Sequence, residues 1–540
     1  MNSKKVTFLV LSFVLAMLAG SCIKDEIDLD NISTRFYWNP KIGLPLAYGR
    51  LTIDDLIESI DSSDNVYEDD NKFLSLIYSS NILSENASDL MKISDQQFNE
   101  VLLESQYNLP PFPTQDTIAL TRSNKYTFDL VQGAVIDSIR LKTGTMIFNI
   151  TSSYKYRGIL KITVPALIKN KKALEINIDI NRSDGMFSYT ENIDITGYRL
   201  DLEHPNATDN LITYNYTAKL INTGAGVSVG DKIEVDINFN DIAFSSMFGY
   251  IGQLQLLNYQ SNINIPLFRN VSEPNIQFAN PILKIITANS FGVPARIELF
   301  NMKTYSEKDD KTVLLGFTPG VNPFYITYPQ TIGGTKTDTV AYSRMTTNID
   351  QALAIGPSNF LYGIRSTANP AGKTSNYVTD SSRIKIDMDI ELPLDLKTSL
   401  LEFSDTLDMD LSGLEENTDK IKSFLIHSSF ENGMPVDLNL QVILLNEGYQ
   451  PVDTLYKTPE QPVIKSATLN QQGRVTGTTK KDIDIVFSKS RIDALQNVRY
   501  ALVKAGIITS NNGSSYVKFY SDYLLNVNFG IQTELEITEE

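Results

Sequence analysis

The segment Ile384-Lys385-Ile386-Asp387-Met388-Asp389-Ile390 alternates apolar and polar residues without interruption. Successive side chains of a β-strand point to opposite faces, so this pattern predicts a strand with one buried and one solvated face. The same alternation recurs in residues 161–164, 174–180 and 232–237. Turn residues separate such runs at strand-length intervals, as in antiparallel sandwiches. We therefore predict a mainly β protein that is built from tandem antiparallel β-sandwich domains.

Helical patterns are short and few. A capping-box start and apolar residues at helical spacing predict a helix over residues 52–60. Residues 85–104 are expected to hold one or two more, and Gly356-Pro357 would stop a helix over residues 347–355. Two further helices are expected over residues 414–423 and 491–498. Because the first two lie early in the chain, a small mixed α+β region is predicted at the N-terminus.

Proline- and glycine-rich stretches suggest domain boundaries. The clearest is Leu109-Pro110-Pro111-Phe112-Pro113, and weaker ones lie at 333–335, 369–372 and 458–462. At about 150 residues per domain, a chain of 540 residues is expected to hold three or four domains. The predicted division is a mixed region at 35–115, a sandwich at 116–275, a β-rich domain at 276–370, a sandwich at 371–458 and a β-rich domain at 459–540.

One sequence element recurs. Ser290-Phe291-Gly292-Val293-Pro294 follows an apolar strand and leads into Ile297 and Leu299, and residues 429–435 lead in the same way into Leu438 and Leu440. Proline lacks a hydrogen-bond donor and suits a strand start or an edge, so we interpret both copies as strand–kink–strand elements of related sandwiches. The element resembles the late-embryogenesis-abundant type of immunoglobulin-like sandwich, in which an asparagine and a proline break the chain between strands. Chance recurrence is the alternative.

The charge and the rare residues exclude several function classes. Acidic residues outnumber basic ones by 64 to 47, for a net charge of −17, whereas nucleic-acid binders usually carry a basic surplus. The two histidines, His204 and His427, and the single Cys22 argue against histidine-rich zinc sites and disulfide frameworks. We find no phosphate loop, dinucleotide fingerprint or metalloprotease helix, and expect no cofactor.

The first 22 residues carry an export signal. Lys4 and Lys5 precede an apolar run of the length of a signal-peptide core, and small residues lead to Cys22. This arrangement looks like a lipobox, in which residues 1–21 are removed and Cys22 is acylated; two or more acyl chains are needed for stable anchoring. Residues 22–34 would form an acidic tether. The alternative is an ordinary secretory signal with an incidental cysteine.

The residues after Cys22 suggest a location. Lys24, Asp25 and Glu26 resemble the surface-export signal of Bacteroidota lipoproteins, in which acidic residues behind the acylated cysteine direct the protein to the outer face of the outer membrane. The resemblance implies a surface-exposed, lipid-anchored protein, and many such proteins serve β-barrel machines for uptake, secretion or barrel assembly. The alternative is a lipoprotein that faces the periplasm.

Two motifs could carry chemistry. Gly226-Val227-Ser228-Val229-Gly230 matches a nucleophile elbow, but the motif needs a helix after the serine, and residues 231–239 alternate as a strand. We interpret it as a glycine-rich hairpin turn. Asp408, Asp410, Ser412 and Asp419 are spaced like part of a calcium loop, a weak candidate because the alternation around them suits a surface strand. Acidic pairs are abundant and none stands out as a glycosidase dyad.

Trp38 and the 26 tyrosines leave two further possibilities open. The apolar cluster around Trp38 is either the first core strand or a strand that docks on a membrane partner. Exposed tyrosines could stack on sugars, although aromatic residues in strands more often pair across a sheet. We therefore expect a non-enzymatic, lipid-anchored outer-membrane surface protein that binds a protein partner, in particular a β-barrel. A glycan-binding surface lipoprotein is the alternative.

Overall fold

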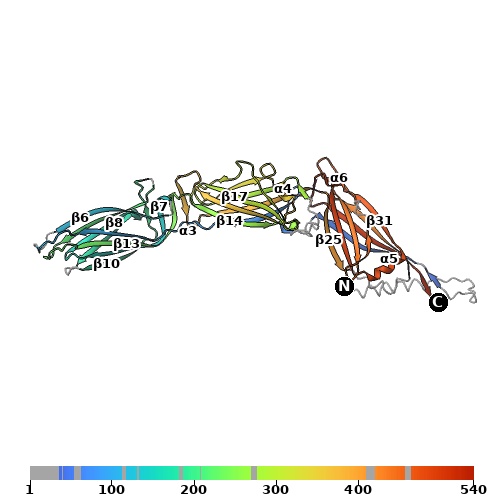
Figure 1. Cartoon of the computed structure of the whole chain (residues 1–540), viewed down its shortest axis with the longest axis horizontal. Coiled ribbons are helices and arrows are strands. Elements are labelled where there is room, and N and C mark those ends of the chain that lie inside the picture. Colours follow the sequence, from blue (N-terminus) through green and yellow to red (C-terminus); the bar gives the residue numbers. More distant parts are fainter. Residues whose placement is uncertain are drawn as a thin grey trace, which may run out of the picture.

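A computed structural model describes residues 36–38, 40–53, 63–111, 117–130, 133–181, 186–206, 208–268, 276–408, 420–456 and 464–539. Antiparallel strands dominate these residues, and the helices among them are short. The predicted fold class is thus confirmed. Figure 1 shows an elongated molecule in which three β-sandwich bodies follow one another along the long axis. We call them the inner, middle and outer modules, after their nesting in the sequence.

The inner module lies at one end of the molecule (Figure 1). One of its sheets has the order β10-β7-β13-β5 and the other β9-β8-β12-β6, and β11 pairs with both β7 and β8. The bounds of its strands are β5 (Gln96–Glu104), β6 (Thr117–Thr127), β7 (Val135–Ser152), β8 (Arg157–Lys169), β9 (Lys172–Asn181), β10 (Phe187–Asp194), β11 (Arg199–Asp201), β12 (Leu211–Ile221) and β13 (Lys232–Tyr250).

The middle module repeats this arrangement. Its sheets have the orders β20-β16-β23-β4 and β18-β17-β21-β14, with β3 and β19 added at the edges. The bounds of its elements are β3 (Val66–Glu68), β4 (Leu74–Leu83), β14 (Gln255–Asn264), β16 (Ile282–Asn289), β17 (Ala295–Ser306), β18 (Lys311–Leu314), β19 (Phe324–Ile326), β20 (Lys336–Tyr342), α4 (Ile349–Leu353), β21 (Asn359–Ala368) and β23 (Ile384–Pro393).

The outer module has the same topology once more. Its sheets have the orders β31-β26-β34-β2 and β28-β27-β32-β25. A helical segment lies between β31 and β32, just as α4 lies between β20 and β21. The bounds are β2 (Lys41–Thr52), β25 (Leu401–Asp408), β26 (Ile421–Asn432), β27 (Val436–Leu445), β28 (Pro451–Leu455), β31 (Thr479–Phe487), α5 (Lys489–Ala494), η6 (Leu495–Asn497), β32 (Tyr500–Thr509) and β34 (Leu524–Leu535).

The modules are nested rather than consecutive. The N-terminal part of the chain contributes one long strand to each: β2 pairs with β34, β4 with β23, and β5 with β13. The inner module is thus inserted between β4 and β14 of the middle module, and both are inserted between β2 and β25 of the outer module. Residues 35–115 supply a strand to every module, and the expected boundaries at 275, 370 and 458 separate strands that pair.

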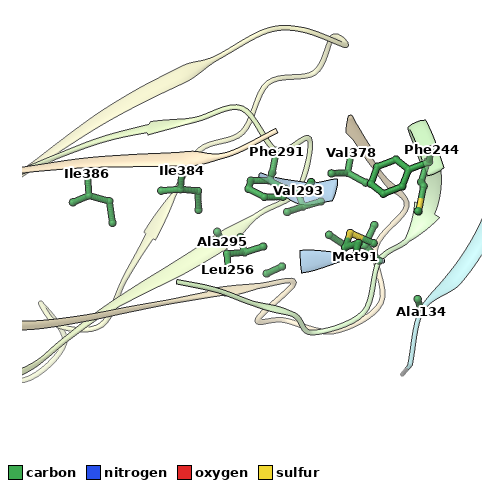
Figure 2. Packing of buried hydrophobic residues seen from close by; sticks show 14 of the residues in the cluster. Met91, Ala134, Phe244, Leu256, Phe291, Val293, Ala295, Val378, Ile384 and Ile386 are labelled. Carbon is green, nitrogen blue, oxygen red and sulfur yellow. The ribbon is translucent and has the colours of Figure 1, made fainter. Parts of the chain in front are cut away.

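The joint between the inner and middle modules is a shared strand and a shared core. β22 (Asn376–Thr379) lies in the β21–β23 connection of the middle module and pairs with β13 of the inner module. Figure 2 shows Phe291 and Val293 of the middle module in the same buried cluster as Val378 of β22 and Phe244 of β13. One hydrophobic core runs through both modules. We infer that these two modules form a stiff unit.

The joint between the middle and outer modules uses the corresponding connection. β33 (Val517–Lys518) lies between β32 and β34 and pairs with β24 (Asp395–Thr398), which also pairs with β15 (Ile276–Phe278). Arg474 adds a polar clamp, because its guanidinium donates to the carbonyl oxygen of Asn71 at 3.0 Å and to a carboxylate oxygen of Asp522 at 2.6 Å.

Several smaller elements complete the chain. They are β1 (Phe36–Trp38), which pairs with β35 (Ile537–Glu539), η2 (Ser63–Asn65), α3 (Ala87–Leu90), η3 (Pro266–Phe268), β29 (Thr468–Leu469), β30 (Val475–Gly477) and α6 (Ser510–Gly513). The strand expected around Trp38 is therefore present as β1.

Two of the helix predictions are confirmed and two need correction. α4 and the α5–η6 pair lie where helices were expected at 347–355 and 491–498. Within 85–104 only α3 is helical, and residues 96–104 form β5, because Phe98 and Leu102 alternate into the core and the strand pairs with β13. In the helix expected over residues 414–423, Ile421–Ser423 instead belong to β26, and residues 414–419 lie outside the described residues. Most of the helix expected over residues 52–60 also lies outside them.

Both strand–kink–strand predictions are confirmed. Asn289 ends β16 and Asn432 ends β26, and β17 and β27 follow within a few residues in the opposite sheet. Phe291 and Met434, two residues beyond each asparagine, are fully buried. The two elements occupy the same place in the middle and outer modules.

Candidate functional site

The predicted lipidation and export residues, Cys22, Lys24, Asp25 and Glu26, lie outside the described residues. The same holds for Asp410, Ser412 and Asp419 of the weak calcium candidate. Asp408 is the last residue of β25 and lies opposite Tyr500 of β32. In the part of the chain that the structure describes, no group of three or more His, Cys, Asp or Glu residues is placed to hold a metal ion. No helix within that part is long and apolar enough to span a membrane.

The loop that contains Ser228 is a tight turn between two sheets. β12 precedes it and β13 follows it, and these strands belong to opposite sheets of the inner module, so the motif is a sheet-to-sheet turn instead of the expected hairpin. Ser228 donates its backbone N–H to a carboxylate oxygen of Asp231 at 2.7 Å. The strand after the serine leaves no helix N-terminus to form an oxyanion hole, which is what a nucleophile elbow requires.

The two histidines lie far from this serine. His204 Nδ1 is 2.5 Å from the carbonyl oxygen of Asp209, and its Nε2 is 3.4 Å from a carboxylate oxygen of Asp137 near the start of β7. Ser228 lies near the other end of β7, roughly 50 Å away at about 3.3 Å per strand residue. His427 is in the outer module, where its Nδ1 is 2.6 Å from a carboxylate oxygen of Asp484. The structure therefore brings no histidine to Ser228.

The free end of the inner module is the strongest candidate for a binding surface. β22 pairs with residues 246–249 of β13, so the start of β13 at Lys232 marks the end away from the joint. Large apolar side chains are exposed there in loops and strand ends from both sheets. We call this set the apolar tip: Tyr107, Leu109, Ile159, Met186, Ile221 and Val229.

Backbone hydrogen bonds hold the two central loops of the tip together. Leu109 and Val227 each donate a backbone N–H to the carbonyl oxygen of the other, at 2.8 and 3.0 Å. The N–H of Val229 donates to Asn108 Oδ1 at 2.8 Å. Gly226 permits this approach, since a Cβ there would lie 2.7 Å from the carbonyl oxygen of Leu109. The exposed side chains of Leu109 and Val229 thus stand on a hydrogen-bonded backbone, and binding through them would cost little ordering entropy.

Behind the tip the inner module is closed and rich in tyrosine. Tyr154 follows β7, is buried, and lies beside Tyr156 with ring centroids 6.0 Å apart. Burial raises the pKa of Tyr154 to about 12, with a smaller contribution from the Asp231 carboxylate. Burial likewise raises the pKa of Tyr214, which lies fully inside the sandwich. These phenols are neutral structural groups at physiological pH.

The sequence interpretation missed the tip. Its six residues lie in four separate stretches, and each looks like an ordinary strand or turn residue alone. One local signal was present: two segments rich in turn residues, Tyr107 to Pro111 and Gly224 to Gly230, each contain apolar residues where polar ones are usual. That they meet depends on β5 being the first strand of the inner module, which the pattern did not reveal.

Comparisons with known proteins give fold likeness at most. No protein-family model and no curated protein matches the chain. A candidate secreted protein from Parabacteroides distasonis ATCC 8503 is similar over 92% of this chain and 99% of its own, at 10% identity and a TM-score of 0.27. The protein of the T13 particle of infectious bursal disease virus covers 89% of this chain and 80% of its own, at 10% identity and a TM-score of 0.16. Resemblance at this level does not extend to function.

Proposed function

We propose that this chain is a non-enzymatic, lipid-anchored surface protein of the outer membrane, which uses a stiff β-rod to present the apolar tip to a protein partner. The observation that carries the proposal is the nesting. The first and last described strands, β1 and β35, lie at the outer module, whereas the inner module lies at the other end of the molecule (Figure 1). An anchor at Cys22 would therefore leave the tip at the end of the rod away from its attachment point, and the flexible tether would let the tip reach a neighbouring membrane protein.

The chemistry of the tip favours a protein partner. Exposed apolar side chains on fixed loops can insert into pockets of another protein, and tyrosine is enriched among the residues that dominate such interfaces. Anchoring on the same membrane would raise the effective concentration of a membrane partner, so a small interface suffices. The partner class that we propose is an outer-membrane β-barrel protein, as the resemblance to Bacteroidota lipoproteins implies.

The test is co-purification from detergent-solubilised outer membranes with the tip altered. The double variant Tyr107→Ser/Val229→Asp should lose the partner that the wild type captures. The matched control is Tyr325→Ser/Val486→Asp, which changes two equally exposed residues in the middle and outer modules. Unchanged capture by the tip variant, with its surface level intact, would contradict the proposal.

Anchoring and display have their own variants. Cys22→Ala should release the protein from membranes, and persistence through high-salt and carbonate washes would refute lipidation. Replacing Lys24, Asp25 and Glu26 by alanine should keep lipidation but abolish cleavage by protease added to intact cells. Equal cleavage of the variant and the wild type would refute the export signal.

The non-enzymatic character is tested by complementation. The variants Ser228→Ala, His204→Ala and His427→Ala should each fully complement a strain that lacks the gene.

The glycan-binding alternative makes a different prediction for the tip. It requires that the wild-type protein binds a polysaccharide from a test panel and that Tyr107→Ala abolishes this binding. It also requires that co-purification from the outer membrane captures no protein partner.

A further inference from the structure

The outer module contains an open apolar cavity between its two sheets. Its volume is about 340 Å³, and the described residues that line it come from β2, β26, β27, β32 and β34, with Met434 and Ile464 from the connecting segments. The central ones are Leu438, Leu440, Val503, Ala505, Val527 and Phe529. None of the described lining residues is charged, and Asn439 is the polar one among them. Leu51 of β2 also lines the cavity and is 41% exposed, so the opening lies beside β2.

The middle module serves as an internal reference for this space. Counted from the paired strand ends, Ala295–Ala368 and Val436–Thr509, the counterparts of Leu438, Leu440 and Ala505 are Ile297, Leu299 and Ile364. The three residues of the middle module are buried, whereas the three of the outer module are partly exposed. The same fold is closed in one copy and open in the other.

Two of the lining positions explain where the space lies. Val527 pairs with Gly49 in the outer module, and the corresponding Ile386 pairs with Ile82, which is buried. Ala505 stands where the middle module has Ile364. The buried lining residues also belong to different clusters: Met434 and Ile507 belong to the large cluster that runs through the middle and inner modules, and Phe430, Ile464 and Val527 belong to a separate one. A gap in the core of this size is costly unless something fills it.

We propose that this cavity binds an acyl chain. A peptide segment or a sugar would bury polar groups against a lining that offers almost no partners, and burial of an unpaired polar group is unfavourable. A hydrocarbon chain has no such groups and can adapt to an irregular space. An engineered apolar cavity of about 150 Å³ takes benzene, so about 340 Å³ should hold roughly a dozen carbons. The polar end of the lipid would remain in water beside β2.

This inference does not depend on the anchor or on the apolar tip. The first test uses the full chain with Cys22→Ala, so that no acyl chain of its own competes. Calorimetric titration with sodium dodecanoate, below its micelle concentration, should show saturable binding near one molecule per chain. Failure to bind dodecanoate would overturn the proposal.

The lining can be closed with the residues that the middle module uses. Gly49→Ile/Ala505→Ile copies Ile82 and Ile364, and should weaken dodecanoate binding at least tenfold without lowering the melting temperature. Ala341→Ile makes the same kind of change on the exposed face of β20 and should bind as before. Equal affinity in the closed variant would mean that the fatty acid binds elsewhere, and would overturn the proposal.

A photoreactive dodecanoate with a terminal diazirine locates the chain without any change to the lining. Its cross-links should map to peptides that contain residues 434–440 or 503–507. Cross-links confined to other peptides would overturn the proposal.

The source of the lipid follows from a comparison of the acylated wild-type protein with the unacylated Cys22→Ala variant. If only the Cys22→Ala variant binds dodecanoate, the acyl chain of the protein's own anchor fills the cavity in the wild type. If both proteins bind dodecanoate, the cavity takes a lipid from outside.

Discussion

Asn289 and Asn432 make the same hydrogen bonds from the same place in two different modules. The Oδ1 atom of Asn289 accepts the N–H of Phe291 at 2.9 Å, and that of Asn432 accepts the N–H of Met434 at 2.8 Å. Each Nδ2 donates to two carbonyl oxygens: those of Val293 and Thr327 in the first case, and those of Val436 and Lys465 in the second. Both side chains are fully buried.

The inner module has a serine at this place. Ser152 ends β7 and its Oγ accepts the N–H of Tyr154 at 3.3 Å. Ser152, Asn289 and Asn432 also pair with the first residues of β10, β20 and β31. A short polar side chain that bonds the backbone two residues ahead is a standard way to turn a chain. The kink where the chain crosses between sheets is therefore common to all three modules.

Removal of the Asn432 side chain should destabilise the outer module. Asn432→Ala leaves one buried N–H and two carbonyl groups without their partner, which we expect to cost roughly 3 kcal/mol of unfolding free energy. Urea unfolding followed by circular dichroism measures the change. Asn528→Ala, at an exposed position of β34, is the control and should change stability by less than about 0.5 kcal/mol. Similar destabilisation by both variants would refute a special role for Asn432.

A side chain at Gly292 should disturb the joint between the middle and inner modules. A Cβ at this position would lie 2.3 Å from the ring of Tyr377, and the N–H of Gly292 donates to the carbonyl oxygen of Tyr377 at 3.1 Å. Gly292→Ala must therefore displace β22, at a cost of about 1–3 kcal/mol. Small-angle scattering should show a wider spread of shapes, and proteolysis near 376–379 should accelerate.

Gly477 provides the control for this variant. A Cβ there meets nothing within 4 Å. Gly477→Ala should therefore leave the scattering curve and the proteolysis rate as in the wild type. If Gly292→Ala behaves in the same way, the shared strand does not set the angle of the joint.

The fold class was predictable from local pattern, and the nesting was not. Residues 384–390 alternate because they form β23, with one face in the core, and alternation is a property of neighbouring residues. The pairing of β4 with β23, by contrast, joins residues about 300 positions apart. Nothing local in residues 74–83 distinguishes that partner from any other strand. The glycine- and proline-rich segments at 333–335 and 369–372 lie at turns within the middle module, so they were poor guides to module limits.

The same contrast between local and distant determinants applies to the kink, to β5 and to the candidate binding sites. The kink at Ser290–Pro294 was predictable because asparagine, glycine and proline act on their own backbone. Residues 96–104 were misjudged as helical because their burial depends on β13, which is distant in sequence. The apolar tip and the cavity are both defined by residues that only the tertiary fold brings together.

The nesting itself predicts which fragments fold. Residues 94–252 contain every strand of the two sheets of the inner module and should unfold cooperatively as a separate domain. Residues 276–370 should stay unfolded, because they lack β4, β14 and β23 of the middle module. Circular dichroism and thermal melts of the two fragments distinguish the outcomes. A folded 276–370 fragment would contradict the assignment of strands to modules.

Alkaline pH should unfold the protein through its buried tyrosines. Burial raises the pKa of both Tyr154 and Tyr342 to about 12, whereas an unfolded chain has tyrosine pKa values near 10. The folded state holds these protons more tightly, so their contribution to stability is complete below pH 10 and is lost as pH rises toward 12. The free energy of unfolding, measured with urea, should thus be steady from pH 8 to 9.5 and fall from pH 10 to 12.

Tyr154→Phe should reduce that fall by up to about 2 kcal/mol, because phenylalanine cannot ionise. The exposed Tyr107→Phe should leave the profile unchanged, and an equal effect of the two variants would show that burial of Tyr154 is not the cause.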